Sequence, residues 1–146
     1  MFIGEYRHTI DEKNRLIIPS CFRHILTGEK DGCVITRGLD GSLFLYPFSE
    51  WQSLGERLKN FSTNRSEHRA FLRIFFSGAH RIKLDAQGRI TLPQPLKEYA
   101  RIKEKVVIIG AFNKLEIWSE DVWNEYYKRK KEDYEQIAEK IMDIEI

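Results

Sequence analysis

The hydrophobic and polar positions along the chain follow one pattern twice. In each copy an alternating strand leads through a tight turn into a second strand, a proline and a short amphipathic helix come next, and two further strands end the unit. In the first copy, strands are predicted at residues 7–10, 15–18, 33–36 and 43–46. In the second copy, they are predicted at residues 81–84, 89–92, 106–109 and 115–118.

The predicted helix of each copy begins at a proline. Pro19 and Pro93 suit the first helical position. The backbone N–H at that position makes no hydrogen bond within the helix, so proline loses nothing by lacking one. The first helix is expected to end near Gly28. The apolar faces are predicted from spacing to be Phe22, Ile25 and Leu26 in the first helix and Leu96, Tyr99 and Ala100 in the second.

The two copies also correspond residue by residue. At an offset of 74 positions the repeated pairs are Gly4 and Gly78, Arg7 and Arg81, Asp11 and Asp85, Arg15 and Arg89, and Pro19 and Pro93. At an offset of 72 they are Val34 and Val106, Gly38 and Gly110, Leu43 and Leu115, and Trp51 and Trp123. Two ordered blocks with matching spacing indicate an internal duplication rather than coincidence.

Helices are predicted outside the two copies. Ser49 with Gln52, and Asn64 with Glu67, have the spacing of capping boxes that open two helices between the copies. Ser119 is expected to cap a last helix that runs to about Met142. The basic run at 128–131 in that helix is followed by acidic residues, which favours a solvated face over a DNA contact.

Composition narrows the class of protein. The chain has 146 residues, 42% of them hydrophobic, which is enough for a folded core and corresponds to one small domain or two fused half-domains. No apolar run approaches the ~18 residues that span a bilayer and the N-terminus is unlike a signal peptide, so a cytoplasmic protein is expected. Cys21 and Cys33 are interpreted as ordinary buried thiols.

The turn between the first two strands of each copy carries the most informative chemistry. Both turns have the form Asp-x-x-x-Arg, in Asp11 to Arg15 and in Asp85 to Arg89. The residue before each arginine is Asn14 or Gly88, the types that best tolerate a positive φ. The aspartates are predicted to shape the loops by accepting backbone N–H bonds. Each arginine either pairs with its own aspartate or projects toward phosphate or guanine, and the motif alone leaves both open.

The distribution of charge along the chain favours a contact of these arginines with phosphate or guanine. The whole chain has a formal charge of only +2, which gives no overall reason to expect nucleic acid. Residues 7–23 nevertheless hold four basic and two acidic residues, residues 81–97 hold four and one, and the remainder carries −3. His8 and His80 lie within these basic segments and are interpreted as partnered surface groups rather than contacts.

The segments 4–15, 38–47 and 87–118 resemble the MraZ family in order and spacing, over residues 1 to about 127. The resemblance implies an α+β fold of tandem duplicated AbrB-like domains, of the double-split β-α-β type with flanking helices. It also implies a nucleoid-associated bacterial regulator that assembles into rings, often octameric. Such rings recognise short tandem direct repeats in the promoter of the division and cell-wall gene cluster to which the regulator belongs.

The resemblance assigns domain limits and DNA-contacting residues to this sequence. The domains expected are an AbrB-like unit at 5–47, a helical connector at 48–75, a second AbrB-like unit at 76–119 and a C-terminal helix at 120–146. The family's Asp-x-x-x-Arg elements fall on the two turns, with Asn14 in place of the usual glycine. Arg81 and Lys83 stand where the family often has acidic residues. The predicted DNA contacts are Arg15, Lys13, Arg89, Asn14, Arg7, Arg81 and Lys83, and the predicted loop-shaping residues are Asp11, Asp85 and Gly88.

The function predicted is DNA-binding regulation of transcription, most simply repression, by a homo-oligomer. An enzyme is not expected, because the sequence has no nucleophilic triad, metal-ligand spacing or phosphate loop. No cofactor, metal, membrane or small-molecule substrate is predicted. The alternative is an AbrB-like scaffold or antitoxin-type module without this operator. The aromatic residues Trp51, Trp118, Trp123, Tyr126 and Tyr127 are expected in the core or between subunits rather than stacked on bases.

Overall fold

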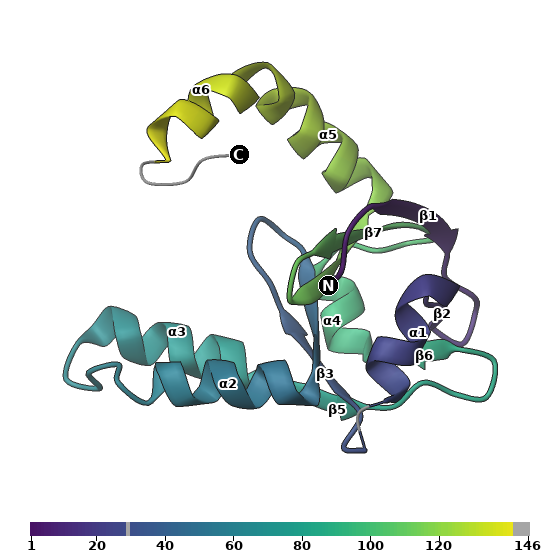
Figure 1. Cartoon of the computed structure of the whole chain (residues 1–146), viewed down its shortest axis with the longest axis horizontal. Coiled ribbons are helices and arrows are strands. Elements are labelled where there is room, and N and C mark those ends of the chain that lie inside the picture. Colours follow the sequence, from purple (N-terminus) through teal and green to yellow (C-terminus); the bar gives the residue numbers. More distant parts are fainter. Residues whose placement is uncertain (29, 142–146) are drawn as a thin grey trace.

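The computed structural model describes residues 1–28 and 30–141 (Figure 1). The strands are β1 (Glu5–Thr9), β2 (Arg15–Ile17), β3 (Cys33–Arg37), β4 (Leu43–Pro47), β5 (His80–Ile82), β6 (Arg89–Thr91), β7 (Lys105–Ala111) and β8 (Lys114–Ser119). The helices are α1 (Ser20–Thr27), α2 (Phe48–Leu58), α3 (Ser66–Ser77), α4 (Gln94–Tyr99), α5 (Glu120–Lys130), a 3-10 turn (Lys131–Asp133) and α6 (Tyr134–Lys140). The predicted α+β class is therefore confirmed.

The strands of the two copies exchange partners. Six of them form one antiparallel sheet in the order β1-β7-β8-β4-β3-β5, and β2 pairs with β6 in a separate two-stranded sheet. The first strand of each copy pairs with the third strand of the other, as β1 with β7 and β5 with β3. Equivalent strands also pair with each other, as β2 with β6 and β4 with β8. The copies are thus interleaved about a pseudo-two-fold relation.

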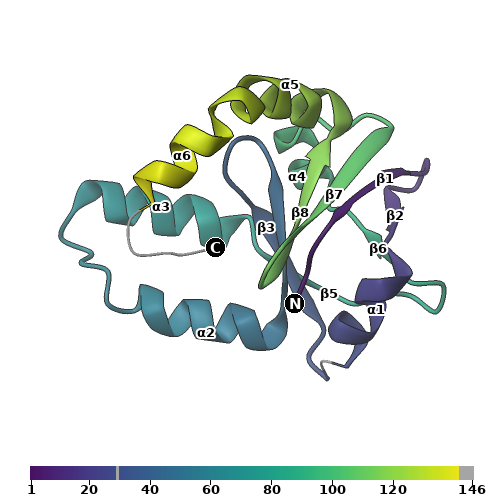
Figure 2. The ribbon, with the colours of Figure 1, turned by 45° about the horizontal axis from the view of Figure 1, so that its top comes forward.

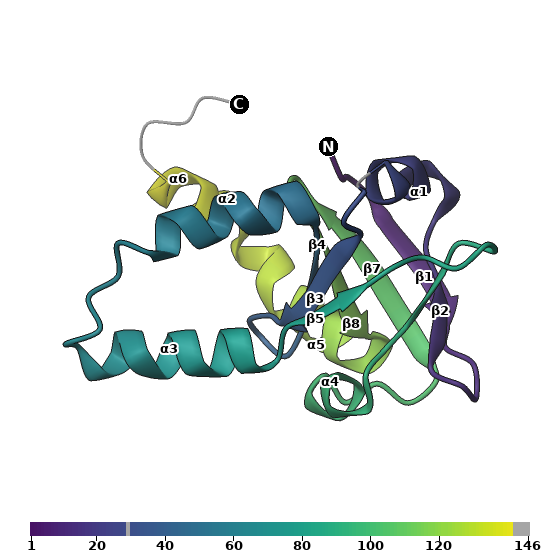
Figure 3. The ribbon, with the colours of Figure 1, turned by 90° about the horizontal axis from the view of Figure 1, so that it is seen from below.

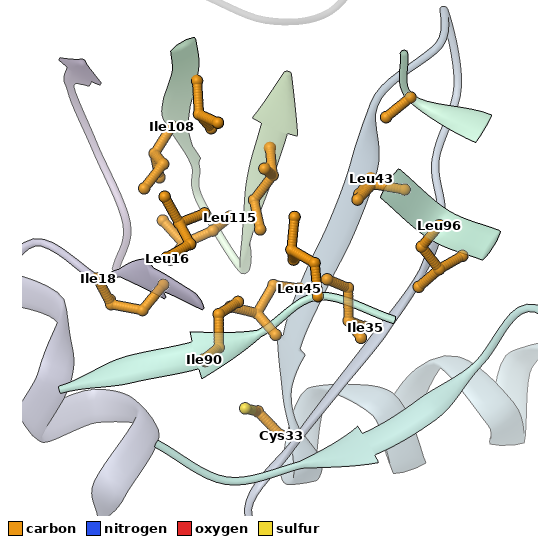
Figure 4. Close-up of a cluster of buried hydrophobic side chains, with 14 of the residues drawn as sticks. Leu16, Ile18, Cys33, Ile35, Leu43, Leu45, Ile90, Leu96, Ile108 and Leu115 are labelled. Carbon is orange, nitrogen blue, oxygen red and sulfur yellow. The ribbon is translucent and has the colours of Figure 1, made fainter. Parts of the chain in front are cut away.

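One hydrophobic core serves both copies. Side chains from β2, β3, β4, β6, β7, β8 and α4 point toward one another between the two sheets (Figure 4). Its fully buried members include Leu16, Ile35, Leu45, Ile90 and Ile108. The predicted boundaries 5–47 and 76–119 therefore separate duplicated sequence segments that share a core, and as domain limits they stay a prediction.

A smaller apolar cluster attaches the helical connector. Phe44 and Tyr46 on β4 pack with Phe75 of α3, and Trp51 of α2 lies against them. The Trp51 and Phe75 rings are stacked with centroids 5.5 Å apart. Trp51 is half-buried, in keeping with the packing role predicted for it. Figures 1 and 3 show the α2–α3 hairpin projecting from one end of the molecule.

The opposite end of the molecule is formed by the two Asp-x-x-x-Arg turns. Turn 1 (Asp11–Arg15) and turn 2 (Asp85–Arg89) lie on the far side of the body from the α2–α3 hairpin in Figures 1 and 3. α5 and α6 leave β8 as a second arm (Figure 2). The fold therefore places the turns that carry the charge motif at the end opposite the α2–α3 hairpin.

Several local expectations are corrected. Pro19 and Pro93 are the N-cap residues of α1 and α4 rather than their first helical residues, because their ψ angles of 135° and 136° are extended. Cys21 is exposed, since burial of Phe22 and Leu26 turns its position on α1 toward solvent, whereas Cys33 is buried as expected.

The flanking helices also differ from the capping predictions. α2 begins at Phe48, one residue before Ser49, and α3 begins at Ser66, after Asn64. Ser119 is the N-cap of α5 as predicted, although its side chain makes no capping bond. The last helix is divided by the 3-10 turn at Lys131–Asp133, and its predicted end at Met142 lies outside the described residues.

Exchange of strands leads to a prediction about the separated halves. Residues 1–62 contain β1 to β4 but lack the β7, β5, β6 and β8 partners that complete their pairing. We expect this fragment to show no folded monomer, because a single hairpin is at best marginally stable in water. Circular dichroism with size-exclusion and light scattering measures this.

The matched control is the full chain cleaved once within residues 60–65, between α2 and α3. This nicked chain keeps all strand pairs and is expected to stay folded and associated. A folded monomer of residues 1–62, at any concentration, contradicts the interleaved arrangement.

Candidate nucleic-acid interface

Turn 1 is organised by one carboxylate. Asp11 Oδ1 accepts the backbone N–H groups of Lys13 and Arg15, both at 2.9 Å, and Asp11 Oδ2 accepts Arg15 Nε at 2.6 Å. The backbone closes the loop through Asn14 N–H to the Asp11 carbonyl at 3.0 Å. Asn14 takes the left-handed conformation with φ 60°. Asp11 therefore shapes the turn and holds the arginine at the same time.

Turn 2 repeats this geometry. Asp85 Oδ1 accepts the backbone N–H groups of Gln87 and Arg89, both at 2.9 Å, and Asp85 Oδ2 accepts Arg89 Nε at 2.8 Å. Gly88 has φ 77° and occupies the place of Asn14. The duplicated motif thus folds into duplicated structure down to single hydrogen bonds.

Hydrogen bonding lowers the pKa of both aspartates. The backbone N–H of Arg15 is the main cause at Asp11, and that of Arg89 is the main cause at Asp85. Because the folded pKa lies below the unfolded one, each carboxylate stabilises its turn above its ordinary pKa and loses this effect as the pH falls through the lowered value. The turns are therefore fully formed at neutral pH.

Both alternatives left open for the arginines are compatible with this geometry. Each arginine makes the local ion pair, and the side chains of Arg15 and Arg89 are 33% and 27% exposed. The hydrogen bond from each arginine to its aspartate uses Nε, one of the five N–H donors of a guanidinium. The aspartate thus orients each guanidinium through Nε, and among the described residues neither guanidinium makes a further hydrogen bond.

Each copy holds the turn of the other copy by a backbone hydrogen bond. The Asn14 carbonyl accepts Leu92 N–H at 2.8 Å, and the Gly88 carbonyl accepts Ile18 N–H at 2.9 Å. These reciprocal bonds continue the β2–β6 pairing to the foot of each turn. The position of each turn is therefore set by backbone from the opposite copy.

Side chains add different contacts between the copies at the two turns. Lys97 Nζ donates to Asn14 Oδ1 at 2.9 Å, and Asn14 Nδ2 donates to Gln94 Oε1 at 3.0 Å. Asn14 thus uses its amide to bind α4 of the other copy. At turn 2, Arg23 of α1 lies across Gly88 and donates Nε to the Ile18 carbonyl at 2.8 Å. The amide of Asn14, predicted to contact DNA, is engaged within the chain.

Sequence reasoning did not assign Arg23, Lys97 or Gln94 to the site. Arg23 and Lys97 are a repeated pair at the offset of 74 and were counted only in the charge of their segments. Their partners are a carbonyl and an amide oxygen, and no acid of the described residues lies within 4.0 Å of either cation. The repeat offset applied to α1 and α4 is the signal that identifies them.

Lys13 and turn 1 border an open groove. Its volume is about 620 Å³, and its basic lining residues are Lys13, Arg15, Lys97 and Lys103. Asp11, Glu12 and Glu104 also line it. The groove has the mixed but cation-rich lining that suits contact with a phosphate backbone.

The remaining predicted contacts lie elsewhere. Arg7 bonds Glu5 at 3.0 Å and Asn124 at 3.1 Å and pairs with Glu120 at 3.3 Å, so it joins β1 to α5. Arg81 pairs with Asp31 at 3.3 Å and its guanidinium lies 4.3 Å from the centroid of the Phe48 ring. Lys83 is exposed on the segment leading to turn 2. A DNA role for these three stays a prediction.

Over residues 1–28 and 30–141, no group of three His, Cys, Asp or Glu side chains is placed to hold a metal ion. Within the same residues, no helix is both long and apolar enough to cross a membrane.

Comparison with known proteins agrees with the duplicated turns. A family model described as "MraZ protein, putative antitoxin-like" matches residues 1–74 and again residues 75–144. The chain belongs to the MraZ family. The tandem AbrB-like arrangement implied by the resemblance is thereby supported by two family matches and by the duplicated α+β structure.

Three relatives carry the name Transcriptional regulator MraZ. The protein of Moorella thermoacetica is 49% identical and that of Natranaerobius thermophilus 46% identical, each over 146 residues and the whole of both chains. The protein of Pelotomaculum thermopropionicum is 47% identical over the whole of this chain and 99% of its own. These names describe regulators and not catalysts, so the expectation of a non-enzymatic protein is confirmed.

The packing of Arg23 against turn 2 can be tested by its effect on stability. A Cβ built on Gly88 lies 2.6 Å from Arg23 Cδ, and the φ of 77° is itself unfavourable for other residues. We expect Gly88→Ala to lower the free energy of unfolding by about 1–2 kcal/mol, measured by denaturant titration.

The matched substitution is Gly55→Ala in α2, where no atom lies within 4 Å of the added Cβ. It is expected to raise the free energy of unfolding by about 0.5–1 kcal/mol, because alanine suits a helix better than glycine. Equal effects at the two positions would contradict the close approach of Arg23 to turn 2.

The position of Arg23 has a second consequence at His8 of β1. Burial is the main cause that lowers the pKa of His8, and the positive charge of Arg23 lowers it further. We expect NMR titration to place this pKa below 6.5 and Arg23→Gln to raise it part of the way back. Arg129→Gln, on α5, serves as the control and leaves it unchanged; an unchanged pKa in Arg23→Gln contradicts the contact.

Proposed function

We propose that this member of the MraZ family is a sequence-specific DNA-binding repressor of transcription. Its targets are short tandem direct repeats in the promoter of the division and cell-wall gene cluster that contains its own gene. It acts as a ring-shaped homo-oligomer of eight copies associated with the nucleoid. The predicted contacts are led by Arg15, with Lys13 on phosphate and Arg89 supporting from the second copy.

The observation that carries the proposal is the pair of matched turns at one end of the molecule. Each turn presents an arginine fork that is oriented by its own aspartate. A planar fork suits both phosphate oxygens and the O6/N7 edge of guanine. The names of the relatives, all regulators of transcription, support the same conclusion.

Assembly is needed because one subunit offers few contacts. Each neutralised phosphate contributes modestly and in a salt-dependent way, so a single pair of turns is expected to bind DNA weakly. In a ring the second and later contacts become intramolecular, and avidity then exceeds the affinity of one site by orders of magnitude. Subunits related by rotation favour direct repeats, and a spacing of roughly 10 bp keeps the repeats on one face of the duplex.

The alternative is an AbrB-like scaffold or antitoxin-type module that does not bind this operator. The wording "antitoxin-like" in the family description is the observation that favours it. A gel shift on the DNA immediately upstream of the gene separates the two. Binding to those repeats at physiological salt, and not to scrambled DNA of equal length, supports the repressor; absence of any binding overturns it.

Arg15 provides the sharpest test of the interface. We expect Arg15→Ala to weaken operator binding by roughly tenfold or more, because a fork to guanine is worth about 1–3 kcal/mol. Fluorescence anisotropy at physiological salt measures the change, with light scattering to show that the oligomer persists. Lys13→Gln is expected to lower the slope of log affinity against log salt by about 1.

The matched control is Arg129→Ala. Arg129 also pairs with an acid four residues earlier, Glu125 at 4.0 Å, but it lies on α5 away from the turns. Operator affinity is expected to be unchanged. Wild-type affinity in Arg15→Ala would remove the proposed role of turn 1.

A further inference from the structure

The α2–α3 hairpin carries an apolar groove where it meets the body. The groove has a volume of about 240 Å³ and is lined chiefly by Leu39, Phe44, Leu54, Phe71, Ile74 and Tyr99, which we call the arm groove. Leu39 and Ile74 are 62% and 57% exposed. Small-molecule sites usually measure about 300–1,000 Å³, so the size of the arm groove suits protein side chains better.

A second apolar surface lies on the C-terminal arm. Tyr134, Ile137 and Ile141 are spaced three and four residues apart, which places them on one side of α6 and its end, and we call them the C-terminal face. Their exposed fractions are 67%, 40% and 51%. Among the described residues, neither hydrophobic cluster of the body includes a residue of α6. Within the described part of the chain, this face is therefore exposed to solvent.

The internal duplication allows the C-terminal arm to be compared with the α2–α3 hairpin. α2 and α5 are equivalent at the offset of 72, since Trp51 corresponds to Trp123. In the first copy α3 folds back on α2, and Trp51 packs on Phe75 and Phe76 at centroid distances of 5.5 and 5.3 Å. In the second copy α6 continues away from α5 instead of folding back (Figure 2). Over the described residues, the C-terminal arm thus has no second helix folded back on α5, and Trp123 packs on Trp118, Tyr126 and Tyr127 instead.

The two surfaces are complementary in charge. Tyr134 and Ile137 of the C-terminal face also border a hollow beside Tyr126 and Tyr127 of α5, and both remain exposed there. Residues 50–77, which surround the groove, hold five basic and three acidic residues, a net of +2. Residues 131–140, which carry most of the face, hold two basic and four acidic residues, a net of −2. Opposite charge around apolar surfaces favours their association and sets its orientation.

We propose that the C-terminal face of one copy docks into the arm groove of the next copy. The contact is a helix in a groove, with Tyr134, Ile137 and Ile141 as its apolar side chains. It joins different surfaces of identical chains, so it is heterologous and closes into a ring when the rotation permits. The inference rests on the proposed ring and identifies the surfaces that build it.

Two variants and their mixture test this interface. Ile74→Glu disables the groove, and Ile137→Glu disables the face; both side chains are exposed in the single chain, so the fold is expected to tolerate them. By light scattering, each variant alone is expected to have the mass of one chain where the wild type is a ring. An equal mixture is expected to form a dimer of one copy of each, because one intact groove then meets one intact face.

Each alternative occupant gives a different result, and each of these results overturns the proposal. A symmetric contact between two grooves closes at two copies and leaves Ile137→Glu with the same mass as the wild type. A face that covers the groove of its own chain, or a groove that binds another protein, leaves both variants as rings. Two monomeric variants that stay monomeric when mixed also overturn it. A wild type with the mass of one chain overturns the proposed ring itself, which separates that failure from failure of the surfaces alone.

Controls keep the test specific. Circular dichroism and thermal unfolding establish that each variant is folded; if either is not, Leu39→Glu replaces the groove variant and Tyr134→Glu the face variant, at side chains 62% and 67% exposed. Ile3→Glu alters an apolar side chain that is 65% exposed and belongs to neither surface. Its ring is expected to persist, and loss of the ring in Ile3→Glu contradicts the assignment.

Discussion

The pairing of β2 with β6 is the interaction on which the rest of the structure depends. Each strand has only three residues, and Leu16 of one lies opposite Ile90 of the other. A pair this short is not stable by itself, so it exists because both side chains are buried in the shared core. From this pair the chain runs directly into turn 1 on one side and turn 2 on the other. The turns therefore inherit their positions from the core.

The two copies satisfy the same constraint with different residues. A left-handed residue must precede each arginine, and the opposite copy must hold the turn in place. In turn 1, Asn14 tolerates the conformation and its amide binds Gln94 and Lys97. In turn 2, Gly88 has no side chain, and the space is used by Arg23. Duplication has preserved the geometry while each copy acquired its own side-chain contacts.

Local pattern was sufficient for most of the elements and for the turns. Alternation and the repeat predicted eight strands within a few residues of their observed ends, and Asp-x-x-x-Arg predicted the loop-shaping role of Asp11 and Asp85. The strand partners could not be predicted from local pattern, because the β1–β7 and β3–β5 pairs join segments that lie far apart in the sequence. The cross-copy roles of Arg23 and Lys97 depend on those partners and were missed for the same reason. The lack of a Cys-x-x-Cys or disulfide pattern predicts only an ordinary buried thiol, whereas the exposure of Cys21 follows from its phase on α1.

The charge of the turns explains why a small net charge is compatible with binding to DNA. Arg15 and Arg89 are each balanced by an aspartate, so their forks contribute orientation more than net charge. Surplus positive charge comes instead from residues with neutral partners, such as Lys97 and Arg23. A subunit built in this way is expected to attract DNA weakly and without much sequence-independent affinity. Strong binding then requires several subunits on one duplex, so the proposed specificity for repeated sites follows from weak single contacts combined with assembly.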